Sequence, residues 1–260
     1  MAVHPSSLVQ AGAIIPSSCE VGPFCTVGAH VRLGERCRIV SHVVLAGDTV
    51  IGDDTIVYPF STIGLPPQDL KFAGEETRVE IGRGNVIREC CTIHKGTPGG
   101  GGVTRIGDHN LIMAYCHIAH DCRIGNHTIF ANAATLAGHV TVEDYAHVGA
   151  LGPVHQFCRI GAHAFIGGGT TITQDVLPFS RTSAVRDAHA FGVNSIGLER
   201  KGFSKETVRN LQRAFRLLLN SGLNTSQALE RMRQENAPAP DANVQHVIDF
   251  IAASQRGVIK

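Results

Sequence analysis

Aliphatic residues recur at every sixth position along most of the chain. Over residues 3–63 all eleven positions in this register are Val, Ile or Leu, and the register returns over residues 81–93. After a shift of one residue it continues over residues 106–172, where only Phe130 is not aliphatic. A period of six fits neither an α-helix nor the simple alternation of a long strand. It predicts coils of 18 residues, each made of three short flat strands with inward aliphatic side chains.

This pattern predicts an all-β left-handed parallel β-helix, a hexapeptide solenoid, as the first domain over residues 1–190. Two interruptions of the hexads predict loops that leave the coil near residues 64–80 and 94–105. The second loop contains four consecutive glycines, residues 99–102. Because no Lys-Ser or Lys-Thr follows them, we interpret this segment as flexible and not as a phosphate-binding loop.

The fourth residue after each aliphatic is the second inward position of a hexad, and it is usually small. Seven of the eight cysteines occupy this position, namely Cys19, Cys25, Cys37, Cys91, Cys116, Cys122 and Cys158. A disulfide framework would not follow a six-residue phase. We therefore expect reduced thiols that act as small buried apolar groups inside the coil.

The hexads end at Ile172, and helical spacing begins near Ser204, a residue type that favours helix N-caps. Apolar residues on one face support this helix, namely Val208, Leu211, Phe215 and Leu218. Gly222 ends it, and further helices are expected over residues 225–235 and 241–254. The chain should therefore end in a small α-helical domain over residues 191–260.

The first of these helices also carries Arg209, Arg213 and Arg216 on one face. Such a face is either simply solvated or a docking surface for an acidic partner. The formal net charge of the whole chain is only +1, which argues against bulk binding of nucleic acid. No secretory signal and no apolar run long enough to span a membrane is visible, so a cytoplasmic location is expected.

Histidines gather where the coil period stacks them. His120, His139 and His155 follow aliphatic residues that are 18 apart, so they should lie along one edge, roughly 5 Å apart per coil. Asp121 lies 18 residues before His139. Such imidazoles can be solvated side chains, zinc ligands or general bases. A neighbouring carboxylate favours general-base chemistry, although the spacing alone leaves a zinc site open.

Several motifs, linked in order along nearly the whole chain, identify a resemblance. They are Gln68-Asp69-Leu70-Lys71, Thr92-Ile93-His94, His117-Ile118-Ala119-His120-Asp121-Cys122, Leu136-Ala137-Gly138-His139-Val140, His155-Gln156-Phe157-Cys158 and Arg200-Lys201-Gly202-Phe203-Ser204. With these motifs the sequence closely resembles the acyl-[acyl-carrier-protein]:UDP-N-acetylglucosamine O-acyltransferases of lipid A biosynthesis. The resemblance implies transfer of an (R)-3-hydroxyacyl chain from acyl carrier protein to the 3-hydroxyl of UDP-N-acetylglucosamine. It also implies a homotrimer with sites between subunits, and neither a metal nor a cofactor.

The resemblance further implies roles for individual residues. His120 would be the general base, Asp121 its orienting carboxylate, and the Gly138 N–H a donor to the oxyanion. The positions expected to bind substrate are Asp69, Lys71, His94, His117, His139, His155 and Gln156, with Asn194 and Arg200 at the nucleotide end. Gly168 corresponds to the position that measures acyl length, and a glycine there predicts a longer hydroxyacyl chain. The segment 181–189 departs from the family pattern and His189 is offset, so no uridine-binding role is assigned there. An acidic carrier protein then favours the docking interpretation of the basic helix.

Four alternatives remain at this point. A zinc hydrase resembling the γ-class carbonic anhydrases shares the fold. The sibling N-acyltransferase of the same pathway carries an additional domain before its hexads, whereas here the hexads begin at Val3. A small-molecule acetyltransferase that uses coenzyme A and a purely structural solenoid complete the list.

Overall fold

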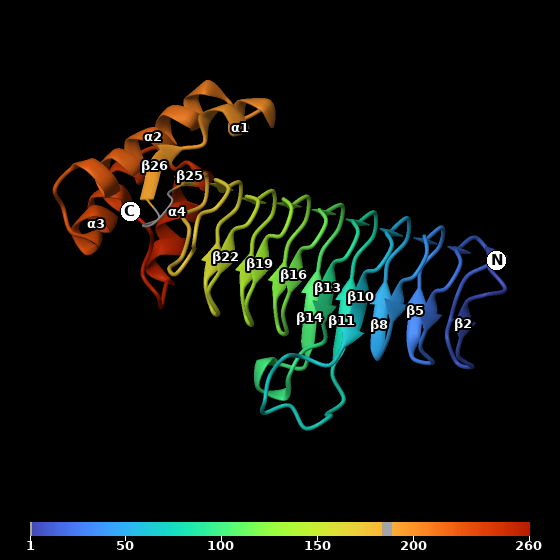
Figure 1. Cartoon of the computed structure of the whole chain (residues 1–260). Helices are drawn as coiled ribbons and strands as arrows, with labels where there is room; N and C mark the ends of the chain where they lie inside the picture. Colours follow the sequence, from blue (N-terminus) through green and yellow to red (C-terminus); the bar gives the residue numbers. More distant parts are fainter. Residues whose placement is uncertain (1, 184–188) are drawn as a thin grey trace.

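Three parallel β-sheets form the walls of a long coil, and helices close its C-terminal end (Figure 1). The computed structural model describes residues 2–183 and 189–260. We call the three sheets A, B and C. Along the chain, successive strands of one turn belong to sheet A, then sheet B, then sheet C. The predicted left-handed parallel β-helix followed by a helical domain is confirmed.

The strands are short, and most have two residues. Sheet A contains, in spatial order, β1 (Ala2–Val3), β3 (Glu20–Val21), β6 (Arg38–Ile39), β9 (Ile56–Val57), β12 (Val86–Ile87), β15 (Leu111–Ile112), β18 (Ile129–Phe130), β21 (His147–Val148), β24 (Phe165–Ile166), β25 (Ser180–Ser183) and β26 (His189–Val193). Sheet B contains β2 (Leu8–Val9), β4 (Thr26–Val27), β7 (Val44–Leu45), β10 (Thr62–Leu65), β13 (Thr92–His94), β16 (His117–Ile118), β19 (Thr135–Leu136) and β22 (Pro153–Val154). Sheet C contains β5 (Val31–Leu33), β8 (Asp48–Ile51), β11 (Arg78–Ile81), β14 (Val103–Ile106), β17 (Arg123–Ile124), β20 (Thr141–Val142) and β23 (Arg159–Ile160).

The aliphatic column predicted from the hexads is the core. Ile93, Ile118 and Leu136 pair in register on neighbouring strands of sheet B, and each is fully buried. Phe130 takes the same inward position and is also fully buried. All eight cysteines are free, and the seven at the second inward position are buried, as expected.

Most corners of the coil turn through a residue in the left-handed backbone region. Among the described residues, seventeen that are not glycine have φ between 52° and 66°, and each lies three positions after an inward apolar residue. Asp121, His139 and Phe157 are the residues of this kind where sheet B turns into sheet C, which we call the B–C corner. Because the turns repeat with the coil, the side chains at one corner stack from coil to coil.

The two loops leave the coil at the B–C corner of successive turns, where Figure 1 shows them protruding together. Their bounds are narrower than the expected 64–80 and 94–105. The first runs between β10 and β11, over residues 66–77, and the second between β13 and β14, over residues 95–102. Ile63 lies on sheet B and Ile81 on sheet C, so the first loop lengthens a single hexad step and does not replace a whole coil. The second contains a 3-10 turn, η1 (Pro98–Gly100).

Four helices follow the coil, namely α1 (Ser195–Arg200), α2 (Lys205–Asn220), α3 (Thr225–Asn236) and α4 (Ala242–Ala252). The last three lie where they were predicted, and the Ser204 hydroxyl caps α2 by accepting from the Thr207 N–H at 3.0 Å. Helix α1 and the antiparallel pair β25–β26 were not predicted. The expected division between residues 190 and 191 falls inside β26, because this strand continues sheet A. None of the described helices is long and apolar enough to cross a membrane.

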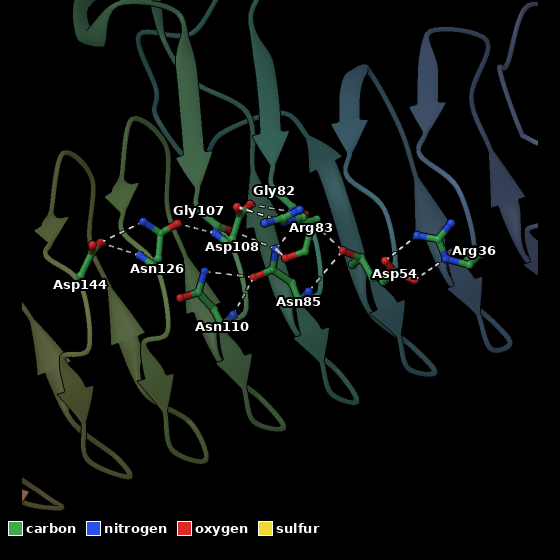
Figure 2. Close-up of polar contacts among 11 residues, drawn as sticks. Arg36, Asp54, Gly82, Arg83, Asn85, Gly107, Asp108, Asn110, Asn126 and Asp144 are labelled. Carbon is green, nitrogen blue, oxygen red and sulfur yellow. Dashed lines mark hydrogen bonds and ion pairs between the residues drawn. The ribbon is translucent and has the colours of Figure 1, made fainter. Parts of the chain in front are cut away.

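Two ladders of polar side chains run along the corner between sheets C and A, one inside the coil and one at its surface (Figure 2). Inside, Asn85 Oδ1 accepts from the Asn110 N–H at 2.9 Å, and Asn110 Oδ1 accepts from the Thr128 N–H at 2.7 Å. At the surface, Asn126 Oδ1 accepts from the Asp108 N–H at 2.7 Å. Both ladders satisfy backbone donors that the turns leave unpaired.

We expect Asn110→Ala to destabilise the protein more than Asn126→Ala. Asn110 is 1% exposed, so its loss leaves buried donors and acceptors unpaired, at a cost of about 1–3 kcal/mol each. The backbone donors that Asn126→Ala leaves unpaired can bond to water, so the free energy of unfolding of that variant should fall by less than about 1 kcal/mol. Urea denaturation followed by circular dichroism measures the free energy of unfolding of each variant. Equal losses would contradict the different roles of the two ladders.

Candidate active site

A histidine and a buried carboxylate form a bonded pair at the B–C corner, directly after β16. His120 Nδ1 lies 2.8 Å from Asp121 Oδ2. The Asp121 side chain is 1% exposed and that of His120 is 16% exposed. Asp121 occupies the left-handed turn position with φ 59°, so the corner itself fixes where its carboxylate stands. The imidazole is the member of the pair that solvent or a substrate can reach.

The next coil adds a second imidazole to this corner. His139 Nε2 lies 3.9 Å from Asp121 Oδ2, and the rings of His139 and His120 meet edge-to-face with centroids 5.1 Å apart. One coil further, Phe157 stacks on His139 at 4.5 Å. His155 lies two residues before Phe157, and its Nδ1 is 3.1 Å from the Gln156 carbonyl oxygen. The side chains of His155 and Gln156 are both exposed. The stacked edge therefore consists of His120, His139 and Phe157, where His155 was expected.

Gly138 allows His120 to lie against the corner. A Cβ at this position would lie 2.5 Å from His120 Cε1 and 2.7 Å from Nε2, closer than any side chain can approach. The Gly138 N–H donates to no other group in the part of the chain that the structure describes. This arrangement leaves a backbone donor beside the imidazole.

Two further histidines lie on strands of sheet B next to the corner. The rings of His94 and His117 are 5.0 Å apart, and His117 Nδ1 lies 2.6 Å from the Thr92 hydroxyl. Burial, reinforced by the charges of His117 and His120, lowers the pKa of His94 to about 4. Burial also lowers the pKa of His117 and that of His139, although nearby Asp121 opposes the latter shift. These imidazoles are consequently neutral at pH 7.

The first loop brings Asp69 and Lys71 to the same side of the coil. The Asp69 carboxylate accepts from the Lys71 N–H at 3.0 Å, and its charge acts to raise the pKa of His139. The Lys71 side chain is exposed. The loop therefore places one carboxylate near the histidines and one ammonium group in solvent.

Three predicted site residues lie elsewhere. Asn194 caps α1 and donates through its side-chain amide to the carbonyl oxygen of His163 at 3.3 Å. Arg200 ends α1 and is exposed, and Gly168 follows β24 on the way from sheet A to sheet B. A single chain thus keeps Asn194, Arg200 and Gly168 away from the B–C corner that holds the other predicted residues. Of the segment 181–189, residues 184–188 lie outside the described residues, and His189 begins β26 with its Nδ1 3.4 Å from the Lys260 carbonyl oxygen.

Sequence reasoning missed two threonines that bind Asp121. The Thr97 N–H donates to Oδ1 at 2.9 Å, and the Thr97 hydroxyl donates to Oδ2 at 2.6 Å. The Asp121 N–H in turn donates to the Thr104 hydroxyl at 2.8 Å. Both threonines belong to the second loop or its following strand, whose glycines had suggested flexibility alone. No periodic signal connects them with residue 121.

The donor set also bears on a metal. Potential ligand atoms of His120, Asp121 and His139 lie within 4.8 Å of one another. Both Asp121 oxygens, however, already accept hydrogen bonds, Oδ1 from Thr97 and Oδ2 from Thr97 and His120. A zinc ion needs three or four ligand atoms that converge at about 2.1 Å on one point, whereas here Asp121 Oδ2 bonds directly to the His120 ring nitrogen that faces it. The observed bonding suits proton transfer better.

The solenoid and its histidine–carboxylate corner define a transferase of the hexapeptide-repeat class, and the family model for the bacterial transferase hexapeptide (six repeats) matches residues 104–138. The model for domain 2 of UDP-N-acetylglucosamine O-acyltransferase matches residues 175–259. The chain belongs to the acyl-[acyl-carrier-protein]–UDP-N-acetylglucosamine O-acyltransferase family. It is 50% identical over 258 residues to the member from Halorhodospira halophila, with 99% of each chain covered. It is 53% identical over 201 residues to that from Alkalilimnicola ehrlichii, covering 77% of each.

Solved structures agree with this assignment. The UDP-N-acetylglucosamine O-acyltransferase of Moraxella catarrhalis matches with a TM-score of 0.95 and 40% identity over 100% of both chains. The UDP-N-acetylglucosamine acyltransferase of Francisella novicida matches with a TM-score of 0.96 and 37% identity, covering 99% of this chain and 93% of that one. The zinc hydrase, the N-acyltransferase, the acetyltransferase and the structural solenoid are therefore set aside.

The buried His94 should make stability depend on pH. Its pKa is about 4 in the folded protein and 6.5 in the unfolded chain, so the unfolded chain binds more protons between these values. Stability should therefore be full above about pH 6.5 and fall as the pH drops towards 4. Denaturation midpoints across this range measure the slope, and His94→Gln should make it shallower. An unchanged slope in that variant would show that His94 does not titrate with folding.

Proposed function

We propose that this chain transfers an (R)-3-hydroxyacyl group from acyl carrier protein to the 3-hydroxyl of UDP-N-acetylglucosamine, the first step of lipid A biosynthesis. The His120–Asp121 pair is the observation that carries the proposal, because it supplies a base that can accept the proton of a sugar hydroxyl. The relative from Halorhodospira halophila, 50% identical over nearly its full length, is named for an acyl carrier protein and for UDP-N-acetylglucosamine.

The pair supports general-base catalysis. A proton on His120 Nδ1 bonds to Asp121, which leaves the lone pair of Nε2 to accept the proton of the sugar hydroxyl. The sugar oxygen then attacks the thioester carbonyl, and the Gly138 N–H donates to the oxyanion that forms. When the C–S bond breaks, imidazolium returns the proton to the departing thiolate of the carrier. Asp121 stabilises the imidazolium between these two transfers. The scheme uses neither a metal nor a cofactor and forms no covalent enzyme intermediate.

The remaining predicted residues are assigned to substrate. We assign Asp69, Lys71, His94, His117, His139, His155 and Gln156 to the sugar and acyl group, and Asn194 and Arg200 to the nucleotide. Neutral imidazoles suit the positions of His94, His117 and His139, because each can donate and accept a hydrogen bond without repelling a neighbour. Gly168 leaves space in the acyl groove, with only the backbone of Ala150 within 4 Å of a Cβ built there. This space supports a longer hydroxyacyl chain.

A homotrimer would join the two groups of residues that one chain keeps apart. The outer face of sheet A supports this assembly, since it carries half-buried apolar side chains, namely Ile56, Val86, Leu111 and Ile129. The corner that follows sheet A adds exposed Phe60 (60%), Tyr115 (66%) and Leu151 (69%). The outer face of sheet C carries charged side chains such as Arg105 and Arg123 instead. Apolar faces of this kind are covered by other copies in oligomers.

The basic face of α2 suits an acidic carrier protein. Arg209, Arg213 and Arg216 are exposed, and within the described chain none of them forms an ion pair. Their charges are therefore available to a partner. Acyl carrier protein and the nucleotide sugar would both be met in the cytoplasm, which is where we place the reaction.

Removing the base should abolish most of the activity. We expect His120→Ala to lower kcat/KM for acyl transfer by at least about 10²-fold, the usual lower range for loss of a general base. The assay uses UDP-N-acetylglucosamine with hydroxyacyl carrier proteins of several chain lengths. His30→Ala is a matched control, because His30 is an exposed histidine near the same corner in an early coil. Turnover like that of the wild type in folded His120→Ala protein would refute the mechanism.

The assembly can be tested separately. Ile129→Arg places a charge on the apolar outer face of sheet A, and we expect it to dissociate the trimer and to lower activity with it. Thr141→Arg puts the same group on the outer face of sheet C and should leave the trimer intact. Light scattering coupled to size-exclusion chromatography gives the molecular mass. A trimeric Ile129→Arg protein would show that this face is not the interface.

A further inference from the structure

The loop over residues 95–102 binds the same carboxylate that bonds to His120. Thr97 makes both contacts, with its N–H on Oδ1 and its hydroxyl on Oδ2 at 2.6 Å. Thr97 itself is buried, at 7% exposure. Asp121 thus receives three donors from two residues, and its two oxygens have fixed partners.

The glycines of this loop permit the close approach. A Cβ on Gly100 would overlap the carboxylate carbon of Asp121, and a Cβ on Gly96 would lie 2.8 Å from Oδ1. The loop therefore passes directly against the carboxylate, where a side chain on either residue would push it away. The Thr104 hydroxyl, which accepts from the Asp121 N–H, fixes the backbone of the same residue.

We infer that Thr97 is a positioning residue for acyl transfer, which acts through Asp121 to hold the His120 imidazole in its reactive orientation. This inference rests on the proposed function of His120. Because the Thr97 donors hold both Oδ1 and Oδ2, the carboxylate cannot rotate, and the free lone pair of Oδ2 stays directed at His120 Nδ1. The imidazole is then held by Nδ1, and Nε2 is presented to the hydroxyl in every turnover.

The alternative is a loop that merely stabilises the fold, and the two roles differ in what they change. A fold-stabilising hydroxyl affects the denaturation midpoint but leaves the rate of folded protein unchanged. A positioning hydroxyl affects kcat and leaves KM nearly constant, because Thr97 touches Asp121 and not the substrate. Misplacement of a base by a fraction of an ångström costs rate steeply.

The test compares Thr97→Val with Thr97→Ser in the full-length protein, with acyl-transfer kinetics as the readout. Thr97→Val keeps the shape and loses the hydroxyl, and we expect kcat to fall about 10- to 100-fold with KM for both substrates within about twofold. Thr97→Ser keeps the donor and should retain most of kcat. Thr49→Val is the matched control, since Thr49 is also buried and its hydroxyl donates to the Ala46 carbonyl oxygen at 2.6 Å, in an early coil. It should lower stability without changing kcat.

Gly100→Ala provides a second variant that leaves the Thr97 hydroxyl in place. Its added methyl group should displace the Asp121 carboxylate, and the same fall in kcat at nearly constant KM is expected. Wild-type kcat in folded Thr97→Val, or an equal loss in Thr97→Ser, would overturn the inference. If Thr97→Val keeps full activity while His120→Ala loses it, only the positioning role fails. If the wild type itself transfers no acyl group, the proposed function fails instead.

Discussion

The parallel register between successive coils is the constraint on which the rest of this structure depends. Each coil places its strands on those of the coil before, with aliphatic opposite aliphatic, as for Ile93, Ile118 and Leu136. A shift of one residue would move every inward side chain to the outside. The buried column and the hydrogen bonds between coils therefore fix the register together. Once it is fixed, the corners stack as well, and side chains at a corner repeat at the spacing of parallel strands.

The candidate site is built on that repetition. His120 and His139 meet with ring centroids 5.1 Å apart because their corners are consecutive, and Phe157 continues the stack. This corner differs from the others because its left-handed residue, Asp121, is a buried carboxylate that bonds to the His120 imidazole. The scaffold supplies rigid spacing, whereas the loops at the same corner supply what the hexads cannot, including the Thr97 donors to the carboxylate. The strands of the coil and the inserted loop thus together fix the positions of His120 and Asp121.

Much of the fold could be predicted from the sequence, because a six-residue period leaves few alternatives. The aliphatic core, the buried cysteines and the capped helix after Ser204 all follow from local pattern. The loop contacts do not, because glycine-rich segments carry no periodicity and the bond from Thr97 to Asp121 spans 24 residues. The exchange of His155 for Phe157 in the stack also escaped prediction. The coil count located the right turn, but the position that joins the stack differs between coils, since His139 and Phe157 hold the left-handed position and His120 precedes it.

Helix α1 and the β25–β26 pair were missed for a related reason. A six-residue helix is shorter than two turns and shows no recognisable period, and β25 and β26 depart from the hexads. The sequence also could not predict that some of the proposed site residues lie far from His120 in one chain, because the repeat does not reveal how the turns of different copies are placed relative to one another. Only the coil geometry shows that Arg200 and Gly168 stand apart from His120 in one chain. We propose that the site is assembled between copies of the chain, which would bring the two groups together.

Subunit complementation tests this central claim most directly. Folded His120→Ala and Arg200→Ala proteins are each expected to be nearly inactive as pure trimers. Mixed trimers, formed by co-expression of the two variants, would contain sites with His120 from one copy and Arg200 from its neighbour. If sites form between copies, random mixing should restore activity to about a quarter of the wild-type value. If mixed trimers stay as inactive as the parent variants, each site lies within one chain and the account is wrong.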